Sequence, residues 1–177
     1  MTVAVLPDDS QSVSALELAR TWIRSIRRNL MDAADRTAIE SLIFRYARYV
    51  DTAQYEALGD LFADAVITAN KTDEVFVGAA AVCNYWRMSN KRFECGTPRT
   101  HHVVTNLEFE VIDEATVNVR SCFSVFQATR LIPLQPIACG RYQDVFSKSL
   151  GDWRFRSKHI EVTLLGDMSD HLNVAIA

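Results

Sequence analysis

Four histidines are the side chains in this sequence best suited to proton transfer near neutral pH, because an imidazole has an ordinary pKa of about 6.5. They are His101, His102, His159 and His171. No two of them have the HxH or HxxxH spacing of metal ligands, and the cysteines form no CxxC pair. The sequence also lacks a GxSxG nucleophile motif and a glycine-rich phosphate loop. We therefore expect acid–base chemistry at histidine, with no metal and no cofactor.

The composition predicts one globular domain that binds neither nucleic acid nor membrane. The chain has 177 residues, of which 49% are hydrophobic, and a formal net charge of −3. Such a chain can bury a core and lacks the basic excess of proteins that bind polyanions. No apolar run approaches the roughly 18 residues of a membrane helix, and acidic Asp8 and Asp9 stand where a secretion signal would be basic. We expect a cytoplasmic protein.

The first half of the chain has the apolar spacing of helices. Predicted helices span residues 12–30, 36–50, 55–62 and 79–89, with short strands at 65–69 and 75–77. The first helix is amphipathic, and its arginines lie largely off the apolar stripe. We expect it to dock on its own domain or on a neighbouring subunit, with a membrane surface as the alternative.

The second half changes to the alternation of β-strands. Expected strands span residues 102–111, 117–129, 137–146 and 153–165. Helices followed by long antiparallel strands favour the α+β class. In the last strand, strict alternation places His159 and Glu161 on an inner face and Lys158, with its basic neighbours, on a solvated face. Whether His159 then lines a pocket or makes an interface contact stays open.

Three motifs carry a family resemblance. They are IFRYARYVD followed by LGDLF (residues 43–62), RTHHVVTN (99–106), and GRYQD with WRF (140–155). Over about residues 36–172 they resemble the SnoaL-like branch of the nuclear transport factor 2-like (NTF2-like) superfamily. The resemblance implies a cone-shaped α+β barrel, in which a strongly bent, mixed and mainly antiparallel sheet surrounds a helix and leaves an apolar pocket. Residues 1–35 would then form an extension and 173–177 a C-terminal tail.

The same resemblance implies a catalytic site. In the eliminating members of the family, a histidine abstracts a proton and an aspartate at the end of the first barrel helix orients it. By motif these are His102 and Asp51. A carboxylate bonded to one ring nitrogen fixes the tautomer and stabilises the imidazolium that forms. Tyr46 would bind or polarise a substrate oxygen, and His101 is expected to point away from the pocket.

Further residues could contact a substrate. Asn106 has the strand parity of His102 and would point into the same pocket. The other candidates for substrate binding are His159, Tyr49, Trp86 and Phe123. The aromatic candidates are equally suited to core packing, which we favour for them. The sequence has Val162 where a bile-acid dehydratase has an arginine in the last strand, which argues against an anionic substrate.

The resemblance leads to two possible functions, because this fold serves enzymes and non-catalytic proteins alike. Dehydratases, a dehydrochlorinase and polyketide cyclases in the superfamily imply a cofactor-independent lyase or isomerase that acts on a small hydrophobic ring compound. The β subunits of aromatic-ring dioxygenases imply instead a non-catalytic subunit or a small-molecule binding protein. For either function we expect a homo-oligomer, and the resemblance favours a homotrimer.

Overall fold

The computed structural model describes residue 14 and residues 31–173. The chain divides into two units, residues 1–31 and 32–177, and the helices and strands with described bounds all belong to the second. The amphipathic helix predicted over residues 12–30 lies outside the described residues. Within residues 31–173, no helix combines the length and the apolar composition needed to cross a bilayer.

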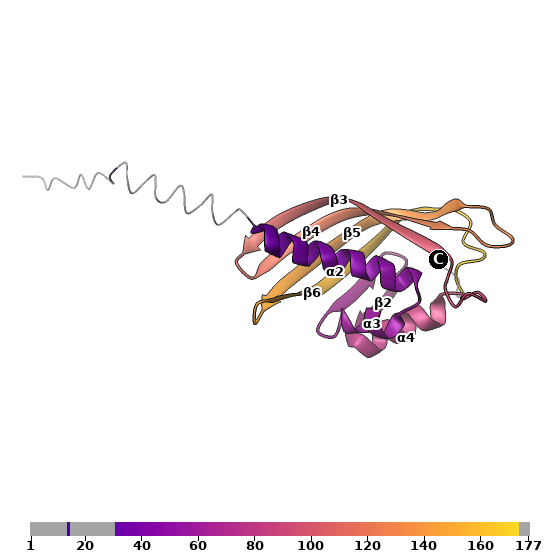
Figure 1. The fold of residues 1–177 in the computed structure, drawn as a ribbon, viewed down its shortest axis with the longest axis horizontal. Helices are drawn as coiled ribbons and strands as arrows, with labels where there is room; N and C mark the ends of the chain where they lie inside the picture. Colours follow the sequence, from indigo (N-terminus) through magenta and orange to yellow (C-terminus); the bar gives the residue numbers. More distant parts are fainter. Residues whose placement is uncertain (1–13, 15–30, 174–177) are drawn as a thin grey trace, which may run out of the picture. The chain divides into compact units, whose positions relative to one another are not determined.

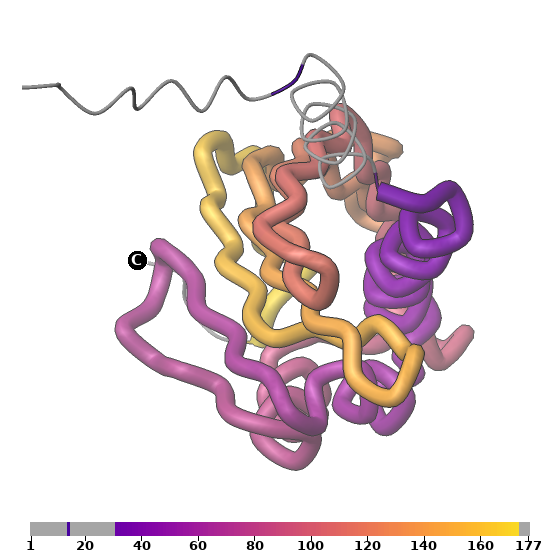
Figure 2. Tube along the Cα trace, turned by 90° about the vertical axis from the view of Figure 1, so that its left-hand side faces the viewer, coloured from indigo at the N-terminus to yellow at the C-terminus, as the bar shows by residue number. Residues whose placement is uncertain are grey.

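Six strands form a single curled sheet. They are β1 (Val66–Ala69), β2 (Thr72–Val77), β3 (Thr100–Asp113), β4 (Thr116–Gln127), β5 (Gln135–Ser149) and β6 (Asp152–Leu165). Their order in the sheet is β2-β1-β6-β5-β4-β3, and β1 runs parallel to β6 while the other neighbouring pairs are antiparallel. This arrangement confirms the predicted α+β class with a bent, mainly antiparallel sheet. The described sheet is not closed, because β2 and β3 form its two edges (Figure 2).

Helix α2 (Ala33–Asp51) packs against β3 and β6 on the concave side of the sheet (Figure 1). Asp32 begins the helix, because its carboxylate accepts a hydrogen bond from the Ala34 N–H at 3.2 Å. The apolar residues recur at helical spacing and are buried on one side: Ile39, Leu42, Ile43, Tyr46, Ala47 and Val50. Burying this face against the sheet places the last helical residue, Asp51, next to the start of β3.

Helices α3 (Tyr55–Asp60) and α4 (Gly78–Ser89) lie together near the C-terminal end of α2 (Figure 1). Aromatic side chains lie between these helices and the sheet. The ring of Tyr46 meets Phe62, Trp86 and Tyr142 edge-on, with centroid distances of 5.9, 6.4 and 5.7 Å. Such edge-to-face contacts fix ring orientation as well as burying apolar area. The interior around Tyr46 is therefore aromatic.

A bulge in β3 changes which of its residues face α2. The pairing with β4 is irregular around Asn106, which has a φ of +56° and is exposed. Phe109, beyond the bulge, faces α2, since the Arg36 guanidinium lies 4.5 Å from its ring centre. The expected alternation, which put Asn106 on the face of His102, is wrong. An extra residue in a strand exchanges the two faces beyond it.

A second irregularity does the same in β6. The register between β5 and β6 shifts next to the pair Phe146 and Phe155. Beyond the shift Lys158 is fully buried, although the unbroken alternation predicted that it would be solvated. His159 lies on the opposite, outer face, where its Nδ1 is 2.8 Å from the Thr68 hydroxyl. The inward orientation expected for His159 is therefore wrong, for the same physical reason as in β3.

Candidate functional site

The carboxylate of Asp51 holds three groups of β3. Its Oδ1 lies 2.5 Å from His102 Nδ1 and accepts a hydrogen bond from the Thr100 hydroxyl at 2.7 Å. Its Oδ2 accepts a hydrogen bond from the His102 backbone N–H at 2.8 Å. The His102 and Asp51 side chains are only 8% and 15% exposed. The structure thus brings together two residues that the resemblance assigned to one site, and it ties the end of α2 to β3.

The surroundings keep Asp51 ionised. Burial favours the neutral acid, but the hydrogen bonds and charge of His102 and the Thr100 hydroxyl outweigh burial and hold the pKa of Asp51 below its ordinary value. Because a carboxylate only accepts, Nδ1 of His102 carries the proton of their bond. Whenever the His102 ring is neutral, its other nitrogen, Nε2, is unprotonated, and no described residue hydrogen-bonds to it. That nitrogen has the lone pair that a general base requires.

Tyr46 is buried, and the ring of a second buried tyrosine, Tyr142, meets it edge-on with a centroid distance of 5.7 Å. Burial, followed by the negative charge of Asp144, raises the pKa of Tyr46 well above its ordinary value. Burial and the proximity of Tyr46 likewise raise the pKa of Tyr142. Both side chains therefore remain neutral hydroxyls at physiological pH. In that form each can donate a hydrogen bond to an oxygen atom.

A buried ion pair lies behind the two tyrosines. Nζ of Lys158 is 3.1 Å from both carboxylate oxygens of Asp144, and neither side chain is exposed. The same Nζ lies 3.5 Å from the ring centre of Tyr142 and 4.4 Å from that of Tyr46. Burial raises the pKa of Asp144 and lowers that of Lys158, while each partner's charge opposes the shift of the other. The ion pair thus depends on mutual contact to stay charged.

Sequence reasoning missed this ion pair because it assumed unbroken alternation in β6. A signal was present in β5, where Asp144 has the same parity as the buried Tyr142. A buried carboxylate requires a cation or several donors nearby. That requirement could have identified a lysine of the adjacent strand as its partner.

His171 is a second histidine whose imidazole is affected by the charges of Asp51 and His102, and no sequence motif assigned it a role. Its side chain is 8% exposed, and its Nδ1 has no hydrogen-bond partner among the described residues. Burial, followed by the positive charge of His102, lowers the pKa of His171 to about 4, although Asp51 opposes that shift. His171 follows the last strand, far from β3 in the sequence, so only the folded structure shows that they are neighbours.

The comparison with protein families shows to which family this domain belongs. Residues 31–159 match the model of the SnoaL-like domain. The chain belongs to the SnoaL-like domain family. This confirms the membership predicted from the three motifs. The matched region contains Asp51 and His102 and ends before His171.

Solved structures of proteins with an NTF2-like or cystatin-like fold resemble this SnoaL-like domain. A candidate scytalone dehydratase from Novosphingobium aromaticivorans has 23% identity and a TM-score of 0.63, over 81% of this chain and 91% of that one. A candidate aromatic-ring-hydroxylating dioxygenase β subunit from the same organism has 16% identity and a TM-score of 0.60, over 73% and 90%. An NTF2-like protein with a cystatin-like fold, also from that organism, has 18% identity and a TM-score of 0.61, over 90% and 96%. At these identities the likeness shows the fold alone, and no curated protein matches the chain.

Two of the predicted aromatic residues share the interior of the SnoaL-like domain with Tyr46. Trp86 packs against Tyr46, and Phe123 stacks on Tyr142 with a centroid distance of 4.3 Å. Both are buried, in agreement with the core packing that the sequence favoured. Tyr49 is half-buried and lies beside Arg48, whose guanidinium carbon is 5.5 Å from its ring centre. Tyr49 therefore lies at the surface of α2.

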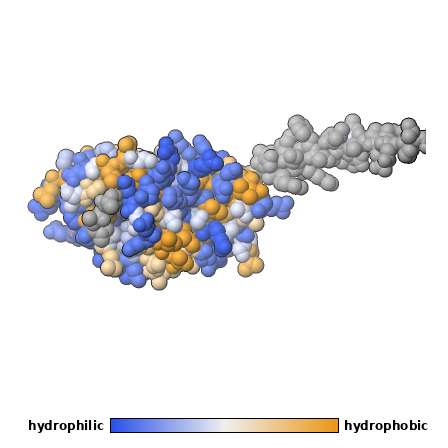
Figure 3. Space-filling model, turned by 180° about the vertical axis from the view of Figure 1, so that it is seen from behind, coloured by the Kyte–Doolittle hydropathy of each residue, from blue (hydrophilic) through white to orange (hydrophobic). Residues whose placement is uncertain are grey.

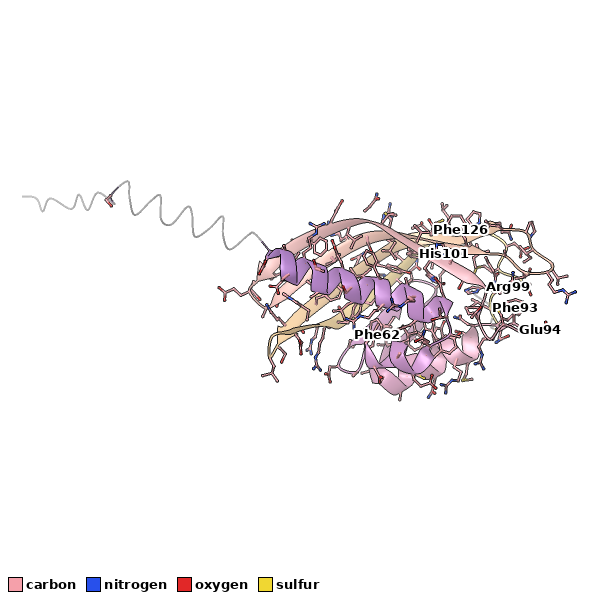
Figure 4. All side chains as sticks on the ribbon, viewed as in Figure 1. Phe62, Phe93, Glu94, Arg99, His101 and Phe126 are labelled. Carbon is pink, nitrogen blue, oxygen red and sulfur yellow. The ribbon has the colours of Figure 1, made fainter. Side chains whose placement is uncertain are left out.

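The remaining predicted residues lie outside this interior. Asn106 is exposed in the bulge of β3, and His159 lines a hollow of about 320 Å³ on the outer face of the sheet. His101 pairs with Phe126 of β4 and is exposed, as expected for a residue that points away from His102 (Figure 4). The side opposite to α2 is largely hydrophilic, with smaller hydrophobic areas (Figure 3). Within the described part of the chain, no three His, Cys, Asp or Glu side chains are grouped as metal ligands.

Proposed function

We propose that this SnoaL-like domain is a cofactor-independent lyase or isomerase, in which His102 removes a proton from a carbon atom of a small, hydrophobic ring compound. The observation behind the proposal is the 2.5 Å contact between Asp51 and His102 Nδ1, which leaves Nε2 available as a base. A protein of the same fold described as a scytalone dehydratase supports the same class of reaction.

The reaction starts with transfer of a proton from a carbon next to an activating carbonyl to Nε2 of His102. The electron pair of the broken C–H bond forms a new carbon–carbon double bond, and charge develops on the carbonyl oxygen. Asp51 stabilises the imidazolium, and the Tyr46 hydroxyl donates a hydrogen bond to that oxygen. In an elimination the carbonyl re-forms, the electron pair of the enolate forms a double bond to the neighbouring carbon and breaks its C–O bond, and the imidazolium protonates the departing hydroxyl, which leaves as water. In an isomerisation the imidazolium returns its proton to another carbon.

The interior around Tyr46 supports a hydrophobic ring compound as substrate. Trp86 and Phe123 provide aromatic surfaces on either side of the two tyrosines. Aromatic rings of a ligand gain from stacked and edge-on contacts with such walls. Asn106 and His159 were predicted to bind substrate, but we leave both out of the proposal because they face away from this interior.

The experiment is exchange of carbon-bound hydrogen in D2O, observed by NMR with cyclohexanone and 2-tetralone as probes. The wild-type chain should catalyse deuterium incorporation next to the carbonyl without any added cofactor. Replacement His102→Gln should slow that exchange by about 100-fold or more, a typical contribution of a general base. Replacement His101→Gln, on the same strand and exposed, should leave the rate unchanged. Exchange at the wild-type rate in a folded His102→Gln variant would exclude His102 as the base.

A non-catalytic subunit or small-molecule binding protein is the second candidate function. The dioxygenase β subunit among the structural neighbours favours it, as does the way Asp51 ties α2 to β3. In that case the contact with His102 is a structural hydrogen bond. Purification from the native host separates the two functions. A subunit should copurify with a larger, brown iron–sulfur protein, whereas an enzyme should be isolated alone and colourless.

We also propose that the protein is a homotrimer, following the family resemblance, and that it is cytoplasmic. Light scattering of the full chain should give three times the mass of 20.0 kDa. Removal of residues 1–30 tests whether the predicted amphipathic helix contributes to assembly. A monomeric mass for the full chain would contradict the trimer.

A further inference from the structure

The segment after β6 is fixed at one end of the sheet by backbone hydrogen bonds. The Lys91 N–H donates to the His171 carbonyl at 2.9 Å, and the Asn173 N–H donates to the Ser89 carbonyl at 2.7 Å. From the sheet, the Gln127 amide donates to the Asp170 carbonyl at 3.1 Å. Residues 170–173 are thus held between the end of α4 and the end of β4.

This attachment brings the segment that contains His171 toward the Asp51–His102 pair, and the charges of both residues act on the His171 imidazole. Gln127, which holds the segment, is the register partner of Thr100 across β3 and β4. Thr100 in turn donates its hydroxyl to Asp51. A short series of contacts therefore runs from the segment to the carboxylate. The His171 side chain is more than nine-tenths buried at the end of this series.

Three buried side chains around the segment have polar atoms without a partner among the described residues. They are Nδ1 of His171, Oε1 of Gln127 and Nδ2 of Asn90. Asn90 forms a bridge to Leu172, and Gln127 bonds to Asp170, so both flank His171. Buried polar atoms without hydrogen bonds are costly and rare in folded proteins. Three of them on side chains in or beside one segment are the basis for the proposal below that a polar group of a ligand binds here.

The chemistry of these atoms selects the kind of group. Asn90 Nδ2 is a donor and Gln127 Oε1 is an acceptor, while a neutral imidazole offers one donor and one acceptor. A hydroxyl both donates and accepts, so it can satisfy such a mixed set. A carboxylate only accepts, and it would leave the Gln127 oxygen without a donor. Burial keeps the His171 imidazole neutral at physiological pH, so it adds no positive charge for an anion.

We propose that His171, with Gln127 and Asn90, forms a subsite that binds a hydroxyl group of the ligand next to the Asp51–His102 pair. The substrate class is then a neutral hydroxylated ring compound, with the hydroxyl held beside the base. This assignment deepens the proposed function and rests on it for the reaction, whereas the binding of a hydroxyl can be measured without any turnover.

Phenol and toluene provide the test, because they have nearly the same shape and differ in the hydroxyl. NMR titration of the full chain should show phenol binding about tenfold more tightly than toluene, with shifts at residues 168–173 and at His102. In the His171→Leu variant the preference should disappear. The His101→Leu variant, changed at an exposed histidine on β3, should keep the wild-type preference.

Three results would overturn the subsite: equal affinity for phenol and toluene in the wild type, an absence of shifts at residues 168–173, or an unchanged preference in His171→Leu. If His171→Leu does not fold, Asn90→Leu provides the same comparison at the unpaired donor. A phenol preference without deuterium exchange at any ketone would support the subsite and reject the lyase or isomerase. Exchange without the preference would do the reverse.

Discussion

Two acid–base pairs are buried in the same domain, and they differ in what surrounds them. Lys158 and Asp144 are fully buried, and the lysine ammonium contacts both carboxylate oxygens and the faces of two tyrosine rings. His102 and Asp51 keep 8% and 15% of their side-chain surface exposed. No described residue bonds to Nε2 of His102. A pair with every contact made inside the protein can hold strands together, whereas a pair with a free nitrogen can act on a ligand.

The two pairs meet at Tyr46. The charge of Asp144 and, more weakly, that of Asp51 raise the pKa of Tyr46, after the larger effect of burial. The lysine ammonium lies against the face of the same ring. The closed pair, Lys158 and Asp144, therefore helps to keep the Tyr46 hydroxyl protonated and its ring in place. The open pair, His102 and Asp51, would use that hydroxyl when charge develops on a substrate oxygen.

The largest effect is expected from breaking the closed pair. Replacement Lys158→Met leaves the Asp144 carboxylate buried without a cation, which should reduce the free energy of unfolding by about 3–5 kcal/mol. The double replacement Lys158→Met with Asp144→Leu should be less destabilising than Lys158→Met alone, because no charge is then buried. Both values come from urea unfolding followed by circular dichroism.

A matched lysine tests whether burial is the cause of that effect. Lys148 pairs with Asp35 at 2.7 Å, but their side chains remain 30% and 25% exposed. Replacement Lys148→Met should therefore reduce the free energy of unfolding by only about 1 kcal/mol. Equal losses for Lys148→Met and Lys158→Met would contradict the distinction between the two kinds of pair.

A smaller effect, which depends on pH, is expected at His171. Its pKa is about 4 in the folded chain, against about 6.5 when unfolded. Between these values the unfolded state binds a proton that the native state does not, so the free energy of unfolding decreases as the pH falls from 6.5 toward 4. The full loss is about 3 kcal/mol. The free energy of unfolding is measured against pH for the wild type and for His171→Asn. The difference between the two curves should isolate this loss.

The groups that act on His171 make the pH experiment specific. His102 opposes a positive charge on it, and Asp51 favours one. Replacement Asp51→Asn removes the favourable charge, so the window of lost stability should extend to lower pH. A pH dependence that is identical in wild type and His171→Asn would mean that His171 is not buried as a neutral imidazole.

The sequence predicted the elements well because their signals are local. The buried face of α2 follows from apolar spacing, but the helix begins at Ala33 and not at the predicted residue 36, because Asp32 caps it. The motifs also placed Asp51 and His102 in one site, and the two side chains are in contact. Local patterns define helices, strands and caps, and a family motif adds the long-range contact that they lack.

The prediction from the sequence was wrong where one extra residue in a strand exchanges the two faces of the strand beyond it. The bulges in β3 and β6 exposed Asn106, turned His159 outward and buried Lys158. Bulges depend on the pairing of two strands, so a period of two along one strand does not reveal them. His171 was missed for a related reason, since hydrogen bonds from Gln127 and Lys91 bring its segment to the pair.

The smallest expected effect tests whether the hydrogen bonds to Asp51 serve the base His102 as well as the fold. Thr100 donates its hydroxyl to the same Asp51 oxygen that contacts His102 Nδ1. Replacement Thr100→Val keeps the shape and should reduce the free energy of unfolding by about 1 kcal/mol. It should also raise the pKa of Asp51 toward its ordinary value, so the stability that depends on the carboxylate should be lost at a higher pH as acid is added.

Thr37→Val is the matched control, because the Thr37 hydroxyl bonds only to the Ala33 carbonyl of its own helix. If Thr100→Val slows deuterium exchange several-fold and Thr37→Val does not, the hydrogen bonds to Asp51 serve the base as well as the fold. Equal exchange rates in the two variants would assign Thr100 to the fold alone.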